Sequence, residues 1–190
     1  MRAPLIGLYS PAPGSGKSTL AAAMFGHGWR VVKFAAPLKA MVAALLREAG
    51  ESADVIERAL EGDLKAQPME ALAGRTPRYT MQTLGTEWGR GAMASDIWVR
   101  LAIMRANRLR AEGVAVIVDD MRFENEARAI QEAGGKLVRI TRPDAASLAG
   151  HASEGALDGF RFDMEVSNTQ ASGLAFGLNW ASPVSAFGWL

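Results

Sequence analysis

A glycine-containing turn lies directly between an apolar segment and a helix-forming one, and this arrangement leaves few folds open to the chain. The run LIGLY at 5–9 predicts a buried strand, and KSTLAAAMF at 17–25 predicts a helix. Between them, Gly14 and Gly16 allow the backbone to curl so that successive N–H groups point inward. A strand, a curled turn and a helix in this order predict an α/β fold.

The turn reads SPAPGSGKST at 10–19, and its end, Gly16-Lys17-Ser18, matches the P-loop pattern. Inward-facing N–H groups and the positive end of the helix favour a bound phosphate. Lys17 is the candidate catalytic cation for the β- and γ-phosphates of ATP, and the Ser18 hydroxyl is a candidate Mg²⁺ ligand. Pro11 stands where the strict pattern has its first glycine, which stiffens the start of the loop. The sequence therefore predicts an ATP site formed by Gly14, Ser15, Gly16, Lys17, Ser18 and Thr19.

A second partner for Mg²⁺ is expected at the end of a neighbouring buried strand, where α/β sheets hold their ligands. The apolar, β-branched run VAVIV at 114–118 leads straight into Asp119 and Asp120. At least one of these two carboxylates is expected to serve the metal, and the sequence leaves open which. Asp120 is also a candidate catalytic residue, whereas Asp119 could instead cap the following helix. No NKxD motif follows, which disfavours a GTPase switch.

Hydrophobic periodicity predicts the remaining elements. Further strands are expected at 30–34 and 136–141, and helices at about 38–49, 53–60, 80–93, 96–112 and 123–133. Alternation of strands and helices predicts a three-layer α/β/α P-loop kinase fold with a parallel central sheet.

The expected organisation is one domain over 1–190. Its core is predicted at about 1–35 and 113–170, a helical substrate-binding insertion over the carboxyl edge of the sheet at about 36–112, and a lid-like loop at about 142–160. The apolar, glycine-rich tail 171–190 could cover the sheet or join two copies as a homodimer, and the sequence leaves both open.

Charge is segregated along the chain. The range 48–70 contains seven acidic residues and two basic ones. The range 75–110 contains seven arginines and two acidic residues. Guanidinium groups grip phosphate through paired hydrogen bonds, so this second stretch suits a polyanionic ligand. For Arg105, Arg108 and Arg110, however, a solvated helix face is the expectation.

Totals exclude several classes of protein. With 21 basic and 20 acidic side chains, a surface devoted to nucleic acid is disfavoured, and no stable nucleic-acid binding is expected. No apolar run approaches the roughly 18 residues needed to span a bilayer, so no membrane partner is expected. Cysteine is absent, which fits a cytoplasmic location.

Several blocks along the chain extend the P-loop signal. They are FAAPLK at 34–39, RYTMQTLGTEWGR at 78–90, DIWV at 96–99, DDMRFENE at 119–126, RP at 142–143 and HASE at 151–154. Together they resemble the bacteriophage deoxynucleoside monophosphate kinases, over most of the chain from Leu5 to about Asn168. The resemblance implies ATP-dependent phosphorylation of a deoxynucleoside monophosphate (dNMP) to the diphosphate, in phage nucleotide metabolism in the host cytoplasm.

Phosphoryl transfer to a second anion requires a phosphate clamp opposite the P-loop. Arg78 is the first candidate for the monophosphate, with Lys39 or Arg90 assisting. Gln82, one helical turn beyond Arg78, offers both a donor and an acceptor to a base edge.

Two tryptophans allow two interpretations. Trp88 is a candidate substrate-binding residue, but it shares a predicted helix stripe with Met81 and Leu84, which favours core packing. The same caution applies to Trp98, which shares a stripe with Leu101 and Met104.

Two further arginines are candidate catalytic residues. Arg122 follows the acidic pair and is expected either to reach the transferring phosphate or to pair with Glu126 at i+4. Arg142 ends the strand at 136–141, just after Arg139, and could supply a lid cation worth several kcal/mol in the transition state. In the lid, His151 is expected to make structural hydrogen bonds, and the resemblance alone implies that Glu154 pairs with a lid arginine.

Two other functions remain open to a chain with these features. One is a different small-molecule P-loop kinase, such as a dephospho-coenzyme A kinase, whose acid and lid patterns are similar. The other is a P-loop ATPase or nucleic-acid-binding module that places the stretch 75–110 on a DNA backbone.

Overall fold

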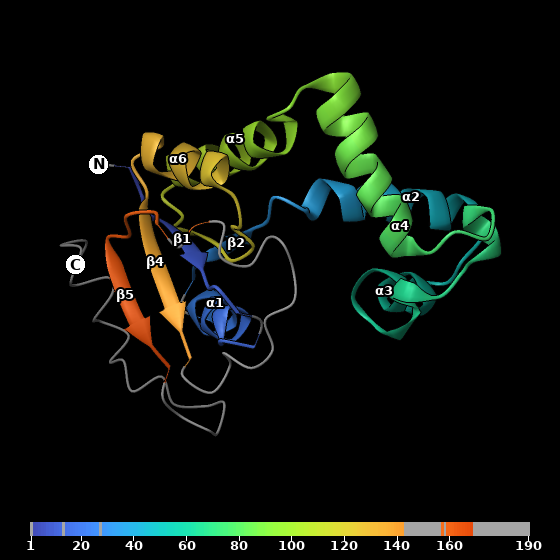
Figure 1. The fold of residues 1–190 in the computed structure, drawn as a ribbon, viewed down its shortest axis with the longest axis horizontal. Helices are drawn as coiled ribbons and strands as arrows, with labels where there is room; N and C mark the ends of the chain where they lie inside the picture. Colours follow the sequence, from blue (N-terminus) through green and yellow to red (C-terminus); the bar gives the residue numbers. More distant parts are fainter. Residues whose placement is uncertain (1, 13, 27, 143–156, 158, 169–190) are drawn as a thin grey trace. The chain divides into compact units, whose positions relative to one another are not determined.

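A computed structural model describes residues 2–12, 14–26, 28–142, 157 and 159–168 (Figure 1). The chain divides into two compact units: unit 1 comprises Met1–Phe34 and Leu101–Leu190, and unit 2 comprises Ala35–Arg100. His151, Glu154, most of the expected lid and the tail 171–190 lie outside the described residues.

Unit 1 is built on a five-stranded sheet in which every pairing is parallel. Its order is β2-β3-β1-β4-β5, so the first strand of the chain is the central one. Gly7 pairs with Val118 on one side and with Leu137 on the other. The strands are β1 (Leu5–Tyr9), β2 (Arg30–Val32), β3 (Val116–Val118), β4 (Lys136–Thr141) and β5 (Met164–Ser167). The predicted parallel sheet is confirmed, although β2 is shorter than predicted and β5 was not predicted.

Helices cover both faces of this sheet. On one face, α1 (Lys17–Gly26) packs Leu20 and Met24 against Ile6 and Leu8 of β1. On the other face, α6 (Glu124–Glu132) contacts β1 and β4, and its buried Ile130 lies beside Gly7. The three-layer α/β/α prediction is therefore confirmed.

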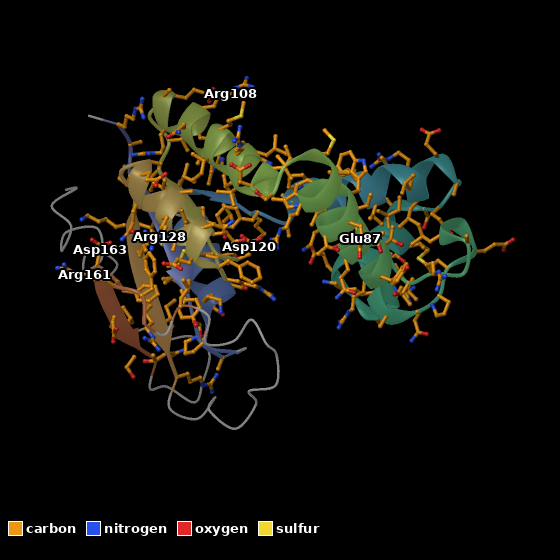
Figure 2. The ribbon with its side chains drawn as sticks, turned by 45° about the horizontal axis from the view of Figure 1, so that its top comes forward. Glu87, Arg108, Asp120, Arg128, Arg161 and Asp163 are labelled. Carbon is orange, nitrogen blue, oxygen red and sulfur yellow. The ribbon has the colours of Figure 1, made fainter. Side chains whose placement is uncertain are left out.

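The helix α5 (Ile97–Ala111) ends in unit 1, where Arg110 is only 5% exposed. Its Nε donates to the Ala3 carbonyl at 2.6 Å, and Nη1 donates to the Ala133 carbonyl at 2.7 Å. Burial lowers the pKa of this guanidinium, which remains a cation because arginine starts so high. The expected solvated position is therefore wrong for Arg110, whereas Arg105 and Arg108 are exposed as expected (Figure 2 labels Arg108).

Most of α5, including Arg110, belongs to unit 1. The helical insertion was expected to reach residue 112, whereas unit 2 ends at Arg100. Because Arg110 joins the end of α5 to the segment before β1 and to the end of α6, the later part of α5 groups with the sheet.

Replacing Arg110 by Met is expected to lower the free energy of unfolding by about 2–3 kcal/mol, because two carbonyls lose charge-assisted hydrogen bonds while the apolar stem is kept. Urea unfolding followed by circular dichroism measures this change. Arg108→Met is the matched control on the same helix, with an expected change below about 0.5 kcal/mol. Equal losses for the two variants would contradict a structural role for Arg110.

Unit 2 is helical throughout its regular elements. Its core consists of buried apolar residues from three of these elements, two of them α-helices and one a short 3₁₀ helix: Val42, Leu46, Ile56, Ala59, Leu60 and Leu72. The elements are α2 (Ala36–Glu48), α3 (Ala53–Glu61), η1 (Asp63–Ala66), η2 (Glu70–Leu72), α4 (Pro77–Thr83), η3 (Leu84–Met93) and the start of α5.

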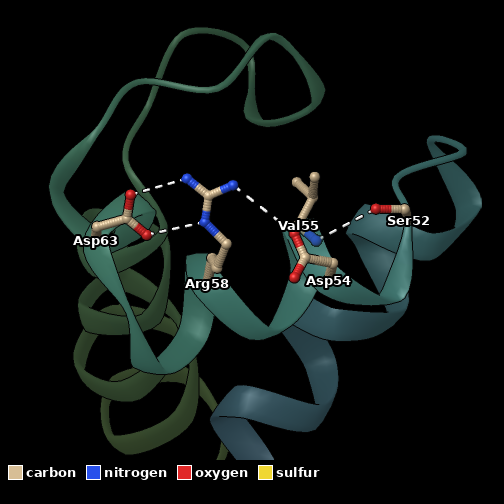
Figure 3. A network of polar contacts seen from close by, with 5 residues as sticks. All are labelled: Ser52, Asp54, Val55, Arg58 and Asp63. Carbon is tan, nitrogen blue, oxygen red and sulfur yellow. Dashed lines mark hydrogen bonds and ion pairs between the residues drawn. The ribbon is translucent and has the colours of Figure 1, made fainter.

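Polar contacts define both ends of α3 (Figure 3). Ser52 accepts a hydrogen bond from the Val55 N–H at 3.3 Å and so caps the first turn. Arg58 donates to both carboxylate oxygens of Asp63, at 3.0 and 2.8 Å, and lies 3.7 Å from Asp54. The guanidinium lowers the pKa of Asp63, so this tie between α3 and η1 is present above the ordinary carboxyl pKa and is lost as the pH falls through the lowered one.

The helix α4 continues without interruption into η3, and Figure 1 draws both in green. The segment Leu84–Met93 is a π-helix, in which N–H groups bond to carbonyls five residues back rather than four. At its end, the Ala94 N–H donates to the Gly89 carbonyl at 3.0 Å. The helix predicted over 80–93 thus ends at Met93 as predicted but begins earlier, at Pro77, and its second half has a different hydrogen-bond register.

Neither of the two predicted apolar stripes is buried as a line. Trp88 is 43% exposed instead of packed with Met81 and Leu84, because the wider turns rotate it away from the buried line. Trp98 is buried, at 5% exposure, yet Leu101 and Met104 of the same expected stripe are exposed.

A search of the described helices finds none that is both long and apolar enough to cross a membrane.

Candidate functional site

The loop between β1 and α1 contains two glycines in a left-handed backbone conformation. Ser10 begins it by accepting from the Ala12 N–H at 3.3 Å and donating to the Ala12 carbonyl at 2.9 Å. Gly14 and Gly16 adopt φ values of 72° and 99°, which side chains disfavour. The helix then begins at Lys17, with the Leu20 N–H bonded to the Gly16 carbonyl at 2.9 Å.

Residues of this loop and of the first turn of α1 line a hollow of about 200 Å³. The lining consists of the six residues predicted for ATP: Gly14, Ser15, Gly16, Lys17, Ser18 and Thr19. Ser15 is buried, and its hydroxyl has no hydrogen-bond partner among the residues that the structure describes. Lys17 is half-buried, and Ser18 and Thr19 are exposed. A concave surface at a helix N-terminus with one lysine has the chemistry of a phosphate site.

Two side chains that are distant in the sequence donate hydrogen bonds to backbone carbonyls of this loop. Arg142, which follows β4, donates from Nη1 to the Gly14 carbonyl at 3.2 Å. Asn168, which follows β5, donates from Nδ2 to the Ser15 carbonyl at 3.1 Å. Arg142 therefore contacts this loop, and the catalytic role expected of it as a lid cation stays a prediction. Asn168 was missed, because a single polar residue after a short strand gives no local signal.

The two acidic residues after β3 have different surroundings. Asp119 is 6% exposed; one carboxylate oxygen, Oδ2, lies 3.3 Å from the Lys33 ammonium. Its other oxygen, Oδ1, is buried and lacks a hydrogen-bond partner within the described part of the chain. In contrast, Asp120 (labelled in Figure 2) accepts at Oδ1 from the Phe34 N–H at 3.0 Å, and this bond joins the ends of β3 and β2. The geometry therefore favours Asp119 for a cation.

Parallel pairing places Asp119 at the same edge of the sheet as the loop. It follows Val118, which pairs with Gly7, two residues before β1 ends. It does not cap the next helix, because α6 begins at Glu124 and Glu126 is the capping carboxylate there. An unpaired, buried carboxylate oxygen at this edge is costly unless a cation or water meets it.

Glu126 also determines how Arg122 is held. The buried Glu126 carboxylate accepts from the Arg122 N–H at 2.7 Å and from the Phe123 N–H at 3.0 Å. Glu126 thus contacts Arg122 through the main chain rather than as the surface ion pair considered above. Arg122 itself is exposed, one residue past the buried Met121.

Arg139 lies in an aromatic cluster at the carboxyl end of β1 and β4. Its guanidinium lies 6.0 Å from the Tyr9 ring centre and 5.8 Å from that of Phe162. The two rings are stacked with centroids 5.4 Å apart. This cluster was not predicted, because its members lie far apart in sequence.

The predicted substrate-binding residues all belong to unit 2. Arg78 and Gln82 are exposed and lie four residues apart on α4, which places them on one face. Arg90 and Trp88 are exposed on η3. The Lys39 ammonium, on α2, forms an ion pair with Glu61, which partly neutralises it for a ligand.

Arginines of the stretch 75–110 are engaged in different ways. Arg75 stacks over the Tyr79 ring at 5.0 Å, Arg100 pairs with Asp96 at 2.7 Å, and Arg108 pairs with Glu112 at 3.5 Å. With Arg110 buried, this stretch is not a continuous basic face.

Few protein ligands are available for a metal. Over the residues that the structure describes, no group of three or more His, Cys, Asp or Glu side chains could hold an ion. Mg²⁺ in phosphate sites is typically bound by one or two protein oxygens together with phosphates and waters. The orphaned Asp119 oxygen and the exposed Ser18 hydroxyl fit that requirement.

Comparison with known proteins gives a sequence match and a structural one. Residues 69–172 match the deoxynucleotide monophosphate kinase family. A putative deoxynucleotide monophosphate kinase of Acanthamoeba polyphaga mimivirus is 31% identical over 165 residues, which cover 79% of this chain and 80% of that one.

Among solved structures, TT1252 from Thermus thermophilus aligns with a TM-score of 0.45 at 18% identity, over 90% of this chain and 91% of that one. A Cys556Ala mutant of the Mycobacterium tuberculosis APS kinase CysC aligns with a TM-score of 0.38 at 14% identity, over 90% and 89%.

Proposed function

The chain belongs to the deoxynucleotide monophosphate kinase family, and we propose on that basis that it transfers the γ-phosphoryl group of ATP to a dNMP. A phosphate oxygen of the dNMP forms a bond to the γ-phosphorus, and the bond from that phosphorus to the β,γ-bridging oxygen breaks. The products are ADP and the deoxynucleoside diphosphate. The observation that carries this proposal is the hollow lined by Gly14 to Thr19, at the sheet edge that also holds the buried Asp119.

The loop would bind the donor. Its inward amides and the N-terminus of α1 neutralise the β- and γ-phosphates, and Lys17 adds a full positive charge. Because the transferring group carries charge on its three equatorial oxygens, cations held in place beforehand lower the barrier. Arg142, already bonded to Gly14, and Arg122 are proposed to contribute such charge.

Magnesium is the proposed metal, with Ser18 and Asp119 as its protein ligands. The buried, unpaired oxygen of Asp119 supports this assignment over Asp120, whose oxygen bonds to the Phe34 N–H. When bound, the ion would supply positive charge to the β- and γ-phosphate oxygens.

The acceptor is proposed to bind in unit 2. Arg78 and Gln82 share one face of α4, so a phosphate on the guanidinium and a base edge on the amide can be held by adjacent turns. Arg90 is the proposed second cation, and Trp88 presents an exposed ring. Lys39, which forms an ion pair with Glu61, is proposed to assist.

The proposal is tested by incubating the purified protein with Mg-ATP and each of the four common dNMPs, then resolving the products by ion-exchange chromatography. Conversion of at least one dNMP to its diphosphate is expected, with the mass of one added phosphate. Dephospho-coenzyme A belongs in the same panel, because its exclusive phosphorylation would reassign the substrate. ATP hydrolysis that occurs only with DNA would favour the nucleic-acid module, against which the engaged arginines of 75–110 argue.

A viral setting is part of the proposal, since the curated relative is from Acanthamoeba polyphaga mimivirus. A bacteriophage source remains a prediction.

Arg78→Ala is expected to raise the KM for the dNMP by about 30-fold or more while the KM for ATP stays within about twofold, because a charged hydrogen bond to phosphate is worth about 2–3 kcal/mol. Initial rates measured against each substrate in turn give both constants. Arg47→Ala, an exposed arginine at the end of α2 in the same unit, is the control and should change neither. A rise in the ATP constant alone would move Arg78 to the donor.

A further inference from the structure

The π-helical form of η3 changes which residues share a line with Arg78. In an α-helix of 3.6 residues per turn, Arg90 would lie about a third of a turn away from Arg78, twelve residues earlier. With hydrogen bonds to the fifth residue back, each turn takes up more residues, and Arg90 returns towards the line of Arg78 and Gln82. Arg78, Gln82 and Arg90 are all exposed, whereas Gly85 and Gly89 of the same continuous helix are buried.

Trp98 occupies that buried side. Its indole N–H donates to the Gly85 carbonyl at 2.9 Å, and a helix carbonyl can accept this bond beside its backbone one. Its ring lies directly against Gly89, where a Cβ would fall 2.2 Å from Cζ2 and 2.6 Å from Cε2. The second contact therefore requires glycine at 89, and both contacts are within unit 2.

We propose that Trp98 is a positioning residue for the acceptor nucleotide: through Gly85 and Gly89 it holds 84–93 in the π-helical register and so aligns Arg90 with Arg78 and Gln82. The inference rests on the proposed function, in which this line of side chains grips the dNMP. Loss of the Trp98 contacts would return the segment to the α-helical register and rotate Arg90 away. The donor loop belongs to unit 1 and is not touched by these contacts.

The sharpest test compares one substitution at two glycines of η3. Gly89→Ala places a methyl group inside the Trp98 ring, whereas Gly91→Ala meets only the Thr86 carbonyl at 3.4 Å, an ordinary contact. Helix propensity changes equally in both variants. We expect Gly89→Ala to raise the KM for the dNMP about tenfold with the KM for ATP unchanged, and Gly91→Ala to alter neither. If a variant simply contained less folded protein, its apparent kcat would fall, but its KM for the dNMP and its KM for ATP would both stay unchanged.

Trp98→Phe removes the N–H donor and keeps an aromatic ring. It is expected to reproduce the tenfold rise for the dNMP, and the double variant with Gly89→Ala is expected to cost no more than the worse single one, because both act on one contact. Trp29→Phe, the same change in the core of unit 1, is the control and should leave both constants unchanged. Amide hydrogen exchange over 84–93 follows the register independently of turnover, and its pattern along the segment should change in Gly89→Ala and Trp98→Phe only, because each N–H would bond to a different carbonyl.

The possible outcomes distinguish failure of the role proposed for Trp98 from failure of the proposed dNMP kinase activity. Wild-type protein that neither phosphorylates nor binds any dNMP, measured by calorimetry, would overturn both. Active wild-type protein with unchanged dNMP constants in Gly89→Ala and Trp98→Phe would overturn the role of Trp98 alone. Equal effects of Gly89→Ala and Gly91→Ala would also overturn it, because only one of those methyl groups reaches the ring.

Discussion

Lys17→Ala is expected to lower kcat for phosphoryl transfer by about 10³-fold or more while the protein remains folded. Lys17 is the first residue of α1 and the one full positive charge among the six residues that line the hollow. The amides of the loop carry only partial charges, so the developing charge on the transferring group would lose its strongest protein partner. Alanine is the best helix former, so α1 should persist.

Steady-state rates of dNDP formation, with circular dichroism to verify the fold, measure this effect. Lys136→Ala is the matched control: it makes the same change at the start of β4, where the ammonium pairs with Asp163 at 2.9 Å (Figure 2 labels Asp163). That variant should keep full activity. If Lys17→Ala turned over at the wild-type rate, the loop would not be the donor site.

Asp119→Asn is expected to lower kcat by about 10²-fold and to raise the Mg²⁺ concentration needed for half-maximal rate, because an amide is a far weaker ligand for a hard cation than a carboxylate is. The shape of the side chain is nearly unchanged, and Lys33, the ion-pair partner of Asp119, is partly exposed and can be solvated. A Mg²⁺ titration of the initial rate measures both quantities.

Asp120→Asn is the comparison that decides between the two adjacent acids. An asparagine oxygen can still accept the Phe34 N–H, so a much smaller loss of activity is expected than for Asp119→Asn. The reverse order of effects would assign the metal to Asp120 and leave the buried oxygen of Asp119 to a water molecule.

Elements whose signal is local could be predicted from the sequence. β1 and β4 lie where their apolar runs predicted them, because each run is short, continuous and bounded by turn residues. α1 begins at Lys17 as the loop pattern requires. The curled loop was also predictable, since two glycines at fixed spacing before a lysine have few other physical uses.

Features that depend on a distant partner could not be predicted. Nothing near Trp88 signals the π-helical register of 84–93, in which Gly89 lies against Trp98 and Trp88 is 43% exposed. Arg110 has the sequence setting of a solvated helix end, yet carbonyls of Ala3 and Ala133 enclose it. The proposed preference for Asp119 over Asp120 likewise rests on the position of the Phe34 N–H, which the sequence does not reveal.

The position of β1 as the central strand of the sheet has a consequence for the nascent chain during translation. Its two neighbours, β3 and β4, are translated more than a hundred residues after it, and the side chains that hold the Gly14 and Ser15 carbonyls come last, at Arg142 and Asn168. During translation, both edges of β1 therefore remain unpaired until β3 and β4 have been synthesised. All of Ala35–Arg100, which forms a unit of its own, is synthesised before that point. The nucleotide loop is encoded first and completed last, so a truncated translation product lacks the residues that hold it.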